Sequence, residues 1–148
     1  MKKKLEFKNF GATIALIILV VVIGTISPQF RTVNNIFSLL RQSSVNGLIA
    51  FGMTFVILTG GIDLSVGAVL ALSTVFAASM ISAGVPVPVA VIISLIIGTV
   101  LGLISGFLVS KGRLQTFIAT LVTMTIYRGI TMIYTNGKPI PTVNQYQI

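Results

Sequence analysis

The sequence contains no cysteine, no histidine and no tryptophan, and only two of its 148 residues are acidic. Without cysteine there is no disulfide scaffold and no thiolate nucleophile, and without histidine there is no imidazole for acid–base catalysis or zinc binding. The lack of tryptophan leaves any aromatic belt at a membrane surface to phenylalanine and tyrosine. These absences exclude thiol chemistry, imidazole acid–base catalysis and metal sites built from cysteine or histidine, so we expect no metal in this chain.

Charge is also scarce, since charged residues make up 8% of the chain and hydrophobic residues 55%. Soluble domains average about 25% charged residues. In a soluble protein the net charge of +8 would suggest nucleic acid as a partner, but so few charges cannot solvate the surface of such a globule. The composition predicts an all-α membrane protein whose surroundings are a lipid bilayer and not nucleic acid.

The charged residues divide the sequence into apolar stretches of the length that a transmembrane helix needs. Residues 31–41 have apolar positions at helical spacing and are expected to be an amphipathic lead-in to the second span. The pair Gly60-Gly61 predicts a helix end, and Pro86 and Pro88 predict a helix break. We expect five spans in a single membrane domain, at about residues 10–27, 42–61, 64–83, 88–110 and 114–134.

The basic residues predict the orientation, because the cytoplasmic side of a membrane retains them. With the N-terminus inside, the interior segments carry Lys2, Lys3, Lys4, Lys8, Lys111 and Arg113, and the exterior segments carry Arg31, Arg41 and Lys138. This imbalance favours a cytoplasmic N-terminus. Five spans then leave residues 135–148 outside.

Three glycines, Gly98, Gly102 and Gly106, recur at every fourth position of the fourth span. This spacing places them on one helical face, where a second helix can approach closely. The alternative is that glycine is simply frequent in membrane helices. We expect this face to be a site of helix packing.

Two charged residues need a particular explanation. Asp63 is the only acid beyond the N-terminal tail, and it is either an N-cap, a role that Ser65 can also fill, or the carboxylate of a cation-coupled mechanism. Arg128 lies within the fifth apolar stretch, where it either faces a partner or cavity or reaches the membrane interface by snorkelling.

Uncharged polar side chains gather at the start of the second span and along the fifth. They are Gln42, Ser43, Ser44 and Asn46, and then Thr116, Thr120, Thr123 and Thr125. Such groups can line a path for a polyhydroxylated solute, which is bound by hydrogen bonds rather than by charge. They can equally join helices, and we favour that role for most of them.

The sequence has neither the G-x-x-x-x-G-K-[ST] phosphate loop nor a G-x-G-x-x-G motif after a strand. If ATP drives this protein, we expect a partner subunit to bind it.

The stretch Leu-Thr-Gly-Gly-Ile-Asp-Leu-Ser-Val-Gly at residues 58–67 resembles the signature of the permease subunits of ribose-type bacterial ABC importers. Residues 44–57 upstream fit the same family, as do residues 111–113, 117–121 and 134–137 downstream. The resemblance covers nearly the whole chain from about residue 27.

The resemblance implies an all-helical, multi-pass permease of the bacterial inner membrane for ribose or a related monosaccharide. Such a permease works as a pair, docks cytoplasmic ATPase domains and receives sugar from a periplasmic or lipoprotein binding protein. The resemblance also implies a transport subunit that is no enzyme, with no catalytic residue and no cofactor of its own. By position, residues 60–67 and 117–121 lie near the translocation path. The candidate path or structural residues are Asn46, Asp63, Ser65, Phe117, Thr120 and Arg128.

Permeases of this family are substantially longer, with a second helical half that couples to the ATPase. We therefore expect this chain to be the N-terminal half of a permease, either as a fragment or as the product of a truncated gene. Two other functions remain as alternatives. One is a small proton-coupled transporter that depends on a membrane-embedded acid, and the other is a membrane assembly protein without transport activity.

Overall fold

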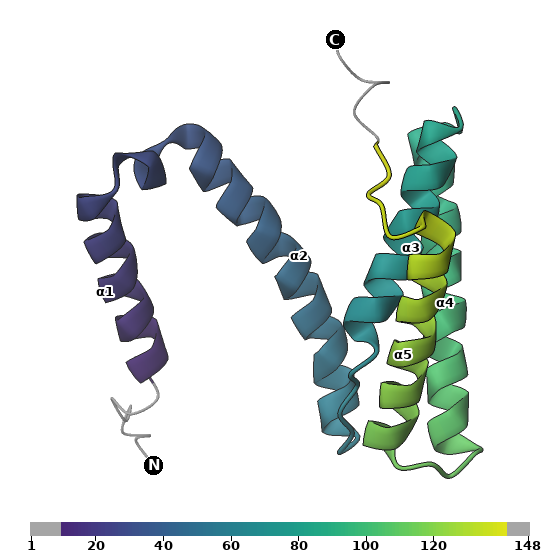
Figure 1. Ribbon diagram of the computed structural model, residues 1–148. Coiled ribbons are helices and arrows are strands. Elements are labelled where there is room, and N and C mark those ends of the chain that lie inside the picture. Colours follow the sequence, from purple (N-terminus) through teal and green to yellow (C-terminus); the bar gives the residue numbers. More distant parts are fainter. Residues whose placement is uncertain (1–9, 142–148) are drawn as a thin grey trace, which may run out of the picture. The chain divides into compact units, whose positions relative to one another are not determined.

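The computed structural model describes residues 10–141, which form five α-helices, one short 3-10 helix and no β-strand (Figure 1). The elements are α1 (Gly11–Ile26), η2 (Pro28–Arg31), α2 (Val33–Leu58), α3 (Val66–Ser82), α4 (Val87–Ser110) and α5 (Thr116–Thr135). The all-α class expected from the sequence is confirmed. The chain divides into two compact units, one up to Ala50 and one from Phe51 onward, and each is described by itself.

The first unit consists of α1, η2 and the first part of α2. Pro28 opens η2, where its missing N–H costs nothing, and the Asn35 side chain donates a hydrogen bond to the Phe30 carbonyl at 2.9 Å. The Thr32 hydroxyl accepts a hydrogen bond of 3.4 Å from the amide of Asn35, which is the contact that a threonine N-cap makes. These contacts set the start of α2 immediately after the turn.

The helical spacing expected over residues 31–41 is confirmed from Val33 onward, whereas the start of the second span stays a prediction. A single helix of 26 residues runs from Val33 to Leu58. No proline interrupts it, and the isolated glycines at 47 and 52 are tolerated within a helix. Arg41 therefore lies within the helix and does not mark a loop. Its long cationic side chain can extend away from the helix surface, so the charge does not interrupt the helix.

The second unit is built on α3, α4 and α5, with α4 running antiparallel to the other two (Figure 1). Its buried apolar centre consists of Ala68 and Leu72 of α3 and Tyr127 of α5. Its other buried residues all have small side chains, and they are Ser65, Ser73, Ala90, Ser105, Ala119, Thr120 and Thr123. Small residues allow helix backbones to approach closely, which is how helices pack where lipid removes the hydrophobic drive.

Two predicted breaks are confirmed at the ends of helices in this unit. Gly60 follows α2 with φ +76°, a conformation that costs glycine nothing. The amide of Gly60 bonds the Ile57 carbonyl and that of Gly61 bonds the Val56 carbonyl, which is the Schellman pattern. At the other break, α4 begins at Val87, directly after Pro86.

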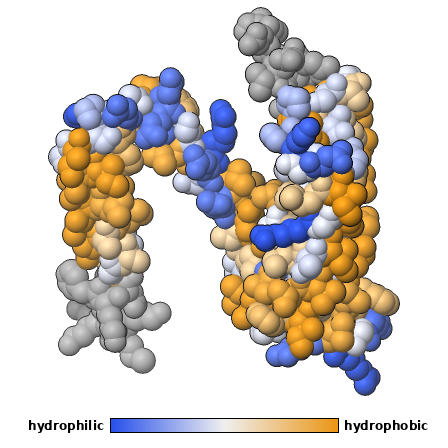
Figure 2. All heavy atoms as spheres, in the orientation of Figure 1, coloured by the Kyte–Doolittle hydropathy of each residue, from blue (hydrophilic) through white to orange (hydrophobic). Residues whose placement is uncertain are grey.

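Two helices, α4 and α5, are long and apolar enough to cross a membrane by length and composition, whereas α1 and α3 are apolar but shorter. Large apolar side chains lie exposed on several of them, among them Leu16, Leu95, Leu103 and Phe107. Figure 2 shows hydrophobic residues along α1 and over the visible side of α4. Exposed apolar surface of this extent suits lipid rather than water. The crossing of the membrane by all five helices stays a prediction.

Candidate functional site

A polar pocket of about 320 Å³ lies in the second unit, where the end of α2 meets α4 and α5. Five of its residues carry polar side chains, and two are glycines. Its lining is Val56, Thr59, Asp63, Gly102, Ser105, Gly106, Val109, Thr116 and Thr120. These residues are far apart in the sequence, so the pocket exists only when the three helix segments are packed together.

The segment between α2 and α3 forms one wall of this pocket and is not helical. Asp63 Oδ1 accepts hydrogen bonds from both the amide and the hydroxyl of Ser65, each at 2.7 Å. A carboxylate that bonds the amide two residues ahead forms an Asx turn, which fixes the local backbone. Ser65 thus occupies the N-cap position of α3, but its hydroxyl bonds Asp63 and makes no side-chain cap.

Helix α5 supports this irregular segment through its first two turns. The hydroxyl of Thr120, which is 2% exposed, lies 3.2 Å from the Ile62 carbonyl and 2.8 Å from the Thr116 carbonyl of its own helix. The Thr116 side chain packs so close to Gly61 that a Cβ there would lie 3.0 Å from its methyl group. The segment between α2 and α3 is therefore held against α5 by van der Waals contact and by the Thr120 hydroxyl, which lies within hydrogen-bonding distance of a carbonyl in each.

Beside the pocket, hydrogen bonds join α4 to α5. The Ser105 hydroxyl donates to Thr123 Oγ1 at 3.1 Å, and the Tyr127 hydroxyl donates to the Leu101 carbonyl at 2.9 Å. In a lipid environment such bonds are worth about 1 kcal/mol each. Thr120 and Thr123 thus make contacts outside their own helix, as residues that join helix segments do. Thr125, in contrast, is exposed and its hydroxyl bonds only its own helix.

The three glycines of α4 do not share one environment. A Cβ on Gly98 would lie 3.1 Å from the hydroxyl oxygen of Ser73 in α3, so this glycine lies at a close helix contact. At Gly102 and Gly106 an added Cβ would meet nothing within 4 Å. Within the described residues the packing expected for all three is found only at Gly98, and packing at the other two stays a prediction about a surface outside them.

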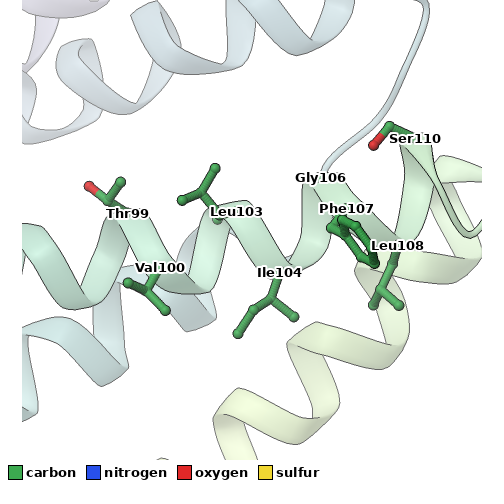
Figure 3. Close-up of a pocket in the computed structure, with 9 residues that line it drawn as sticks. Thr99, Val100, Leu103, Ile104, Gly106, Phe107, Leu108 and Ser110 are labelled. Atoms are coloured by element: carbon green, nitrogen blue, oxygen red, sulfur yellow. The ribbon is translucent and has the colours of Figure 1, made fainter.

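Gly102 and Gly106 also border a second, mostly apolar hollow along the surface of α4 (Figure 3). All of its lining residues come from this one helix, and they are Thr99, Val100, Gly102, Leu103, Ile104, Gly106, Phe107, Leu108 and Ser110. Figure 3 shows side chains projecting from opposite sides of the helix, such as Leu103 and Ile104. A hollow lined by one helix is an exposed helix face, whereas the polar pocket is lined by residues of several segments.

The remaining candidate residues lie away from the polar pocket. Phe117 and Arg128 are both exposed on α5. Asn46 belongs to the first unit, where it borders a hollow with Arg41 and Gln42. Of the six candidates the structure brings Asp63, Ser65 and Thr120 together.

Sequence reasoning did not single out Thr59, Val56 or Val109, and it treated Thr116 as one of a series of threonines along the fifth span. Thr59 belongs to the segment that carries the family resemblance, which was the available signal for it. No local pattern marks Val56 or Val109 as pocket residues, because their role depends on which helix packs against which.

The helical fold, the apolar surface and the signature segment beside a polar pocket are the features of a membrane transport permease. A family model described as branched-chain amino acid transport system / permease component matches residues 35–147. The chain belongs to this family of permease components. Proteins similar to this chain are named permeases, which supports the expectation of a transport subunit rather than an enzyme.

The ribose import permease RbsC of Haemophilus influenzae is 60% identical over 129 residues, which are 87% of this chain and 40% of that protein. RbsC of Bacillus subtilis is 53% identical over 143 residues, 94% of this chain and 44% of that protein. The D-allose permease AlsC of Escherichia coli is 44% identical over 138 residues, 92% of this chain and 42% of that protein. The chain thus spans about 40% of the length of the first of these relatives. No solved structure matches it.

Proposed function

We propose that this chain forms part of the transmembrane path of an ABC importer for ribose or a related monosaccharide, as a multi-pass segment of the bacterial inner membrane. The observation that carries the proposal is the 60% identity to a ribose import permease over 87% of the chain. The matched residues of the family include the segment at 58–67 and the helices that enclose the polar pocket. Ribose is favoured because the relatives at 53–60% identity are named ribose permeases, whereas the one at 44% identity is named a D-allose permease.

The chemistry of the pocket agrees with a neutral polyhydroxylated solute. Such a solute is bound through hydrogen bonds to hydroxyls and carboxylates on a small number of placed side chains. The pocket offers three threonines, one serine and one carboxylate, and no cationic side chain lines it. A phosphorylated sugar or a carboxylate substrate would call for arginine or lysine there.

The proposed partners follow from the same role. They are a second permease copy, a cytoplasmic ABC ATPase, a periplasmic or lipoprotein sugar-binding protein and the lipid bilayer. These 148 residues contain no phosphate loop, so ATP would be bound outside them. The binding protein supplies the sugar, so the permease itself needs only weak contacts along the path.

The test is a chimeric permease in which this chain replaces the matching segment of the Haemophilus influenzae ribose permease. The chimera is expressed in a strain that lacks its own ribose permease but keeps the ATPase and the binding protein. We expect uptake of labelled ribose, and we expect none when the ATPase is inactivated by substitution of its phosphate-loop lysine. A chimera that reaches the membrane at the normal level and imports no ribose contradicts the proposal.

A further inference from the structure

Two polar groups on the wall of the pocket have no hydrogen-bond partner within residues 10–141. One is Oδ2 of Asp63, since both hydrogen bonds to this carboxylate fall on Oδ1. The other is the hydroxyl of Thr116, a pocket residue whose side chain also lies close to Gly61. Both side chains are only half-buried, so each can meet a solute without first losing a bond.

The other polar side chains of the pocket are already used by the fold. Thr59 donates to the Val56 carbonyl at 2.7 Å, Thr120 to the Thr116 carbonyl at 2.8 Å, and Ser105 to Thr123 at 3.1 Å. A hydroxyl has one proton to donate, so these three retain only acceptor capacity. Asp63 and Thr116 are therefore the groups that the fold leaves available.

Gly102 and Gly106 also line the pocket, where they contribute no side-chain volume. Among the described residues a Cβ at either position would meet nothing within 4 Å, so their lack of a side chain leaves space within this unit. The resulting volume of about 320 Å³ lies at the small end of the range of roughly 300–1,000 Å³ that is typical of small-molecule sites. A pocket of this size suits a single sugar ring.

We propose that Asp63 and Thr116 bind hydroxyl groups of the transported monosaccharide in this pocket, with Gly102 and Gly106 providing the room for the ring. This inference rests on the proposed sugar transport. Asp63 Oδ2 accepts a hydrogen bond from one sugar hydroxyl, and hydrogen bonds to an ionised acceptor are the stronger ones. Thr116 both donates to and accepts from a second hydroxyl.

The position of the pocket indicates when the contact is made. It lies at the end of the unit where α4 ends and α5 begins, beside the segment that carries Lys111 and Arg113. The distribution of basic residues predicts this end to be cytoplasmic. The sugar would then meet Asp63 and Thr116 late in the path, shortly before release.

The first experiment measures ribose uptake by the chimeric permease with single substitutions. Asp63→Asn keeps an oxygen acceptor for Ser65 and removes the charge, and we expect about tenfold slower uptake because a hydrogen bond to a charged group is lost. Thr116→Val keeps the shape and removes the hydroxyl, with an expected loss of roughly threefold or more, whereas Thr116→Ser retains most uptake. The matched control is Thr125→Val, which removes an exposed hydroxyl from the same helix and should leave uptake unchanged.

The second experiment detects occupancy of the pocket directly and uses the absence of cysteine from this chain. Thr116→Cys and Thr125→Cys are introduced separately into the chimera, and alkylation by a maleimide is timed in detergent, with the labelling of the unsubstituted chimera subtracted. We expect excess ribose to slow alkylation at position 116 by threefold or more and to leave position 125 unaffected. Adding Asp63→Asn should remove the protection.

The outcomes separate this inference from the proposed function. A chimera that imports no ribose refutes the proposed function. A chimera that imports ribose normally with Asp63→Asn and Thr116→Val refutes the sugar contact alone, as does ribose that protects positions 116 and 125 equally or protects neither. Slower uptake without ribose protection at position 116 also overturns the contact, because it leaves these residues a structural role.

Discussion

Gly98 and Gly102 belong to the same series of glycines in α4, and replacing each of them by alanine in turn tests whether they have different roles. Both changes add one methyl group to α4, and both gain up to about 1 kcal/mol of helix propensity. At Gly102 the new methyl meets nothing within 4 Å, whereas at Gly98 it lies 3.1 Å from the Ser73 hydroxyl oxygen. The difference between the two variants therefore isolates the packing of α3 against α4.

The magnitude of that difference follows from what Ser73 can do. Its hydroxyl donates to the Val69 carbonyl at 2.8 Å, so rotating it away from a Cβ at Gly98 gives up a hydrogen bond worth about 1 kcal/mol. Keeping the bond instead forces the two helices apart, and overpacking of this kind costs about 1–3 kcal/mol. We expect Gly98→Ala to be less stable than Gly102→Ala by about 1–3 kcal/mol.

The assay is unfolding of the purified chain in mild detergent by increasing amounts of sodium dodecyl sulfate, followed by helical circular dichroism. The stabilities of the two variants are compared with each other and with that of the unsubstituted chain. Relative to the unsubstituted chain, we expect Gly102→Ala to be neutral or stabilising. Equal stability of the two variants would refute the reasoning, because it would mean that α3 and α4 do not approach closely at Gly98. A less stable Gly102→Ala would show that a neighbour contacts this position after all.

Three further predictions follow from the charges and the local contacts. A cysteine at Gly112 should resist an impermeant thiol reagent in intact cells and one at Asn144 should react, and labelling at Gly112 from outside would overturn the five-span orientation. Tyr127→Phe should lower the unfolding free energy by about 1 kcal/mol, because it removes the bond to the Leu101 carbonyl; no loss in the detergent assay would mean that this bond adds nothing. Gly60→Ala should cost about 1–2 kcal/mol because φ is +76°, and an unchanged stability would show that the end of α2 can relax.

The ends of the helices were the part of the fold that local chemistry could predict. Gly60 and Pro86 act through their own backbone conformations, so their effect does not depend on distant residues. The continuity of α2 past Arg41 was not predicted, because dividing the chain at its charges treats Arg41 as a loop residue. A guanidinium on a long side chain is compatible with a helix that continues past it.

The pocket was only partly predictable. Asp63 stands out in the sequence as a lone acid, but its place in the same pocket as Thr116 depends on how α5 packs against the segment after α2. The glycines of α4 show the limit most clearly. The spacing indicates that they share a face, yet it cannot tell Gly98, which contacts α3, from Gly102, which leaves an opening, because that difference lies in the neighbouring helix.

The contact between Thr120 and the Ile62 carbonyl joins residues 58 positions apart, and this separation has a consequence for synthesis. At roughly 5–20 residues per second, α5 leaves the ribosome about 3–12 s after the segment that it supports. During that interval α3 and α4 can already pair through Gly98 and Ser73, but the segment around Asp63 has no helix beside it. The polar pocket is thus completed in the last step of assembly of this unit. A nascent chain arrested before Thr120 emerges should hold a paired α3 and α4 and leave the segment around Ile62 open to protease.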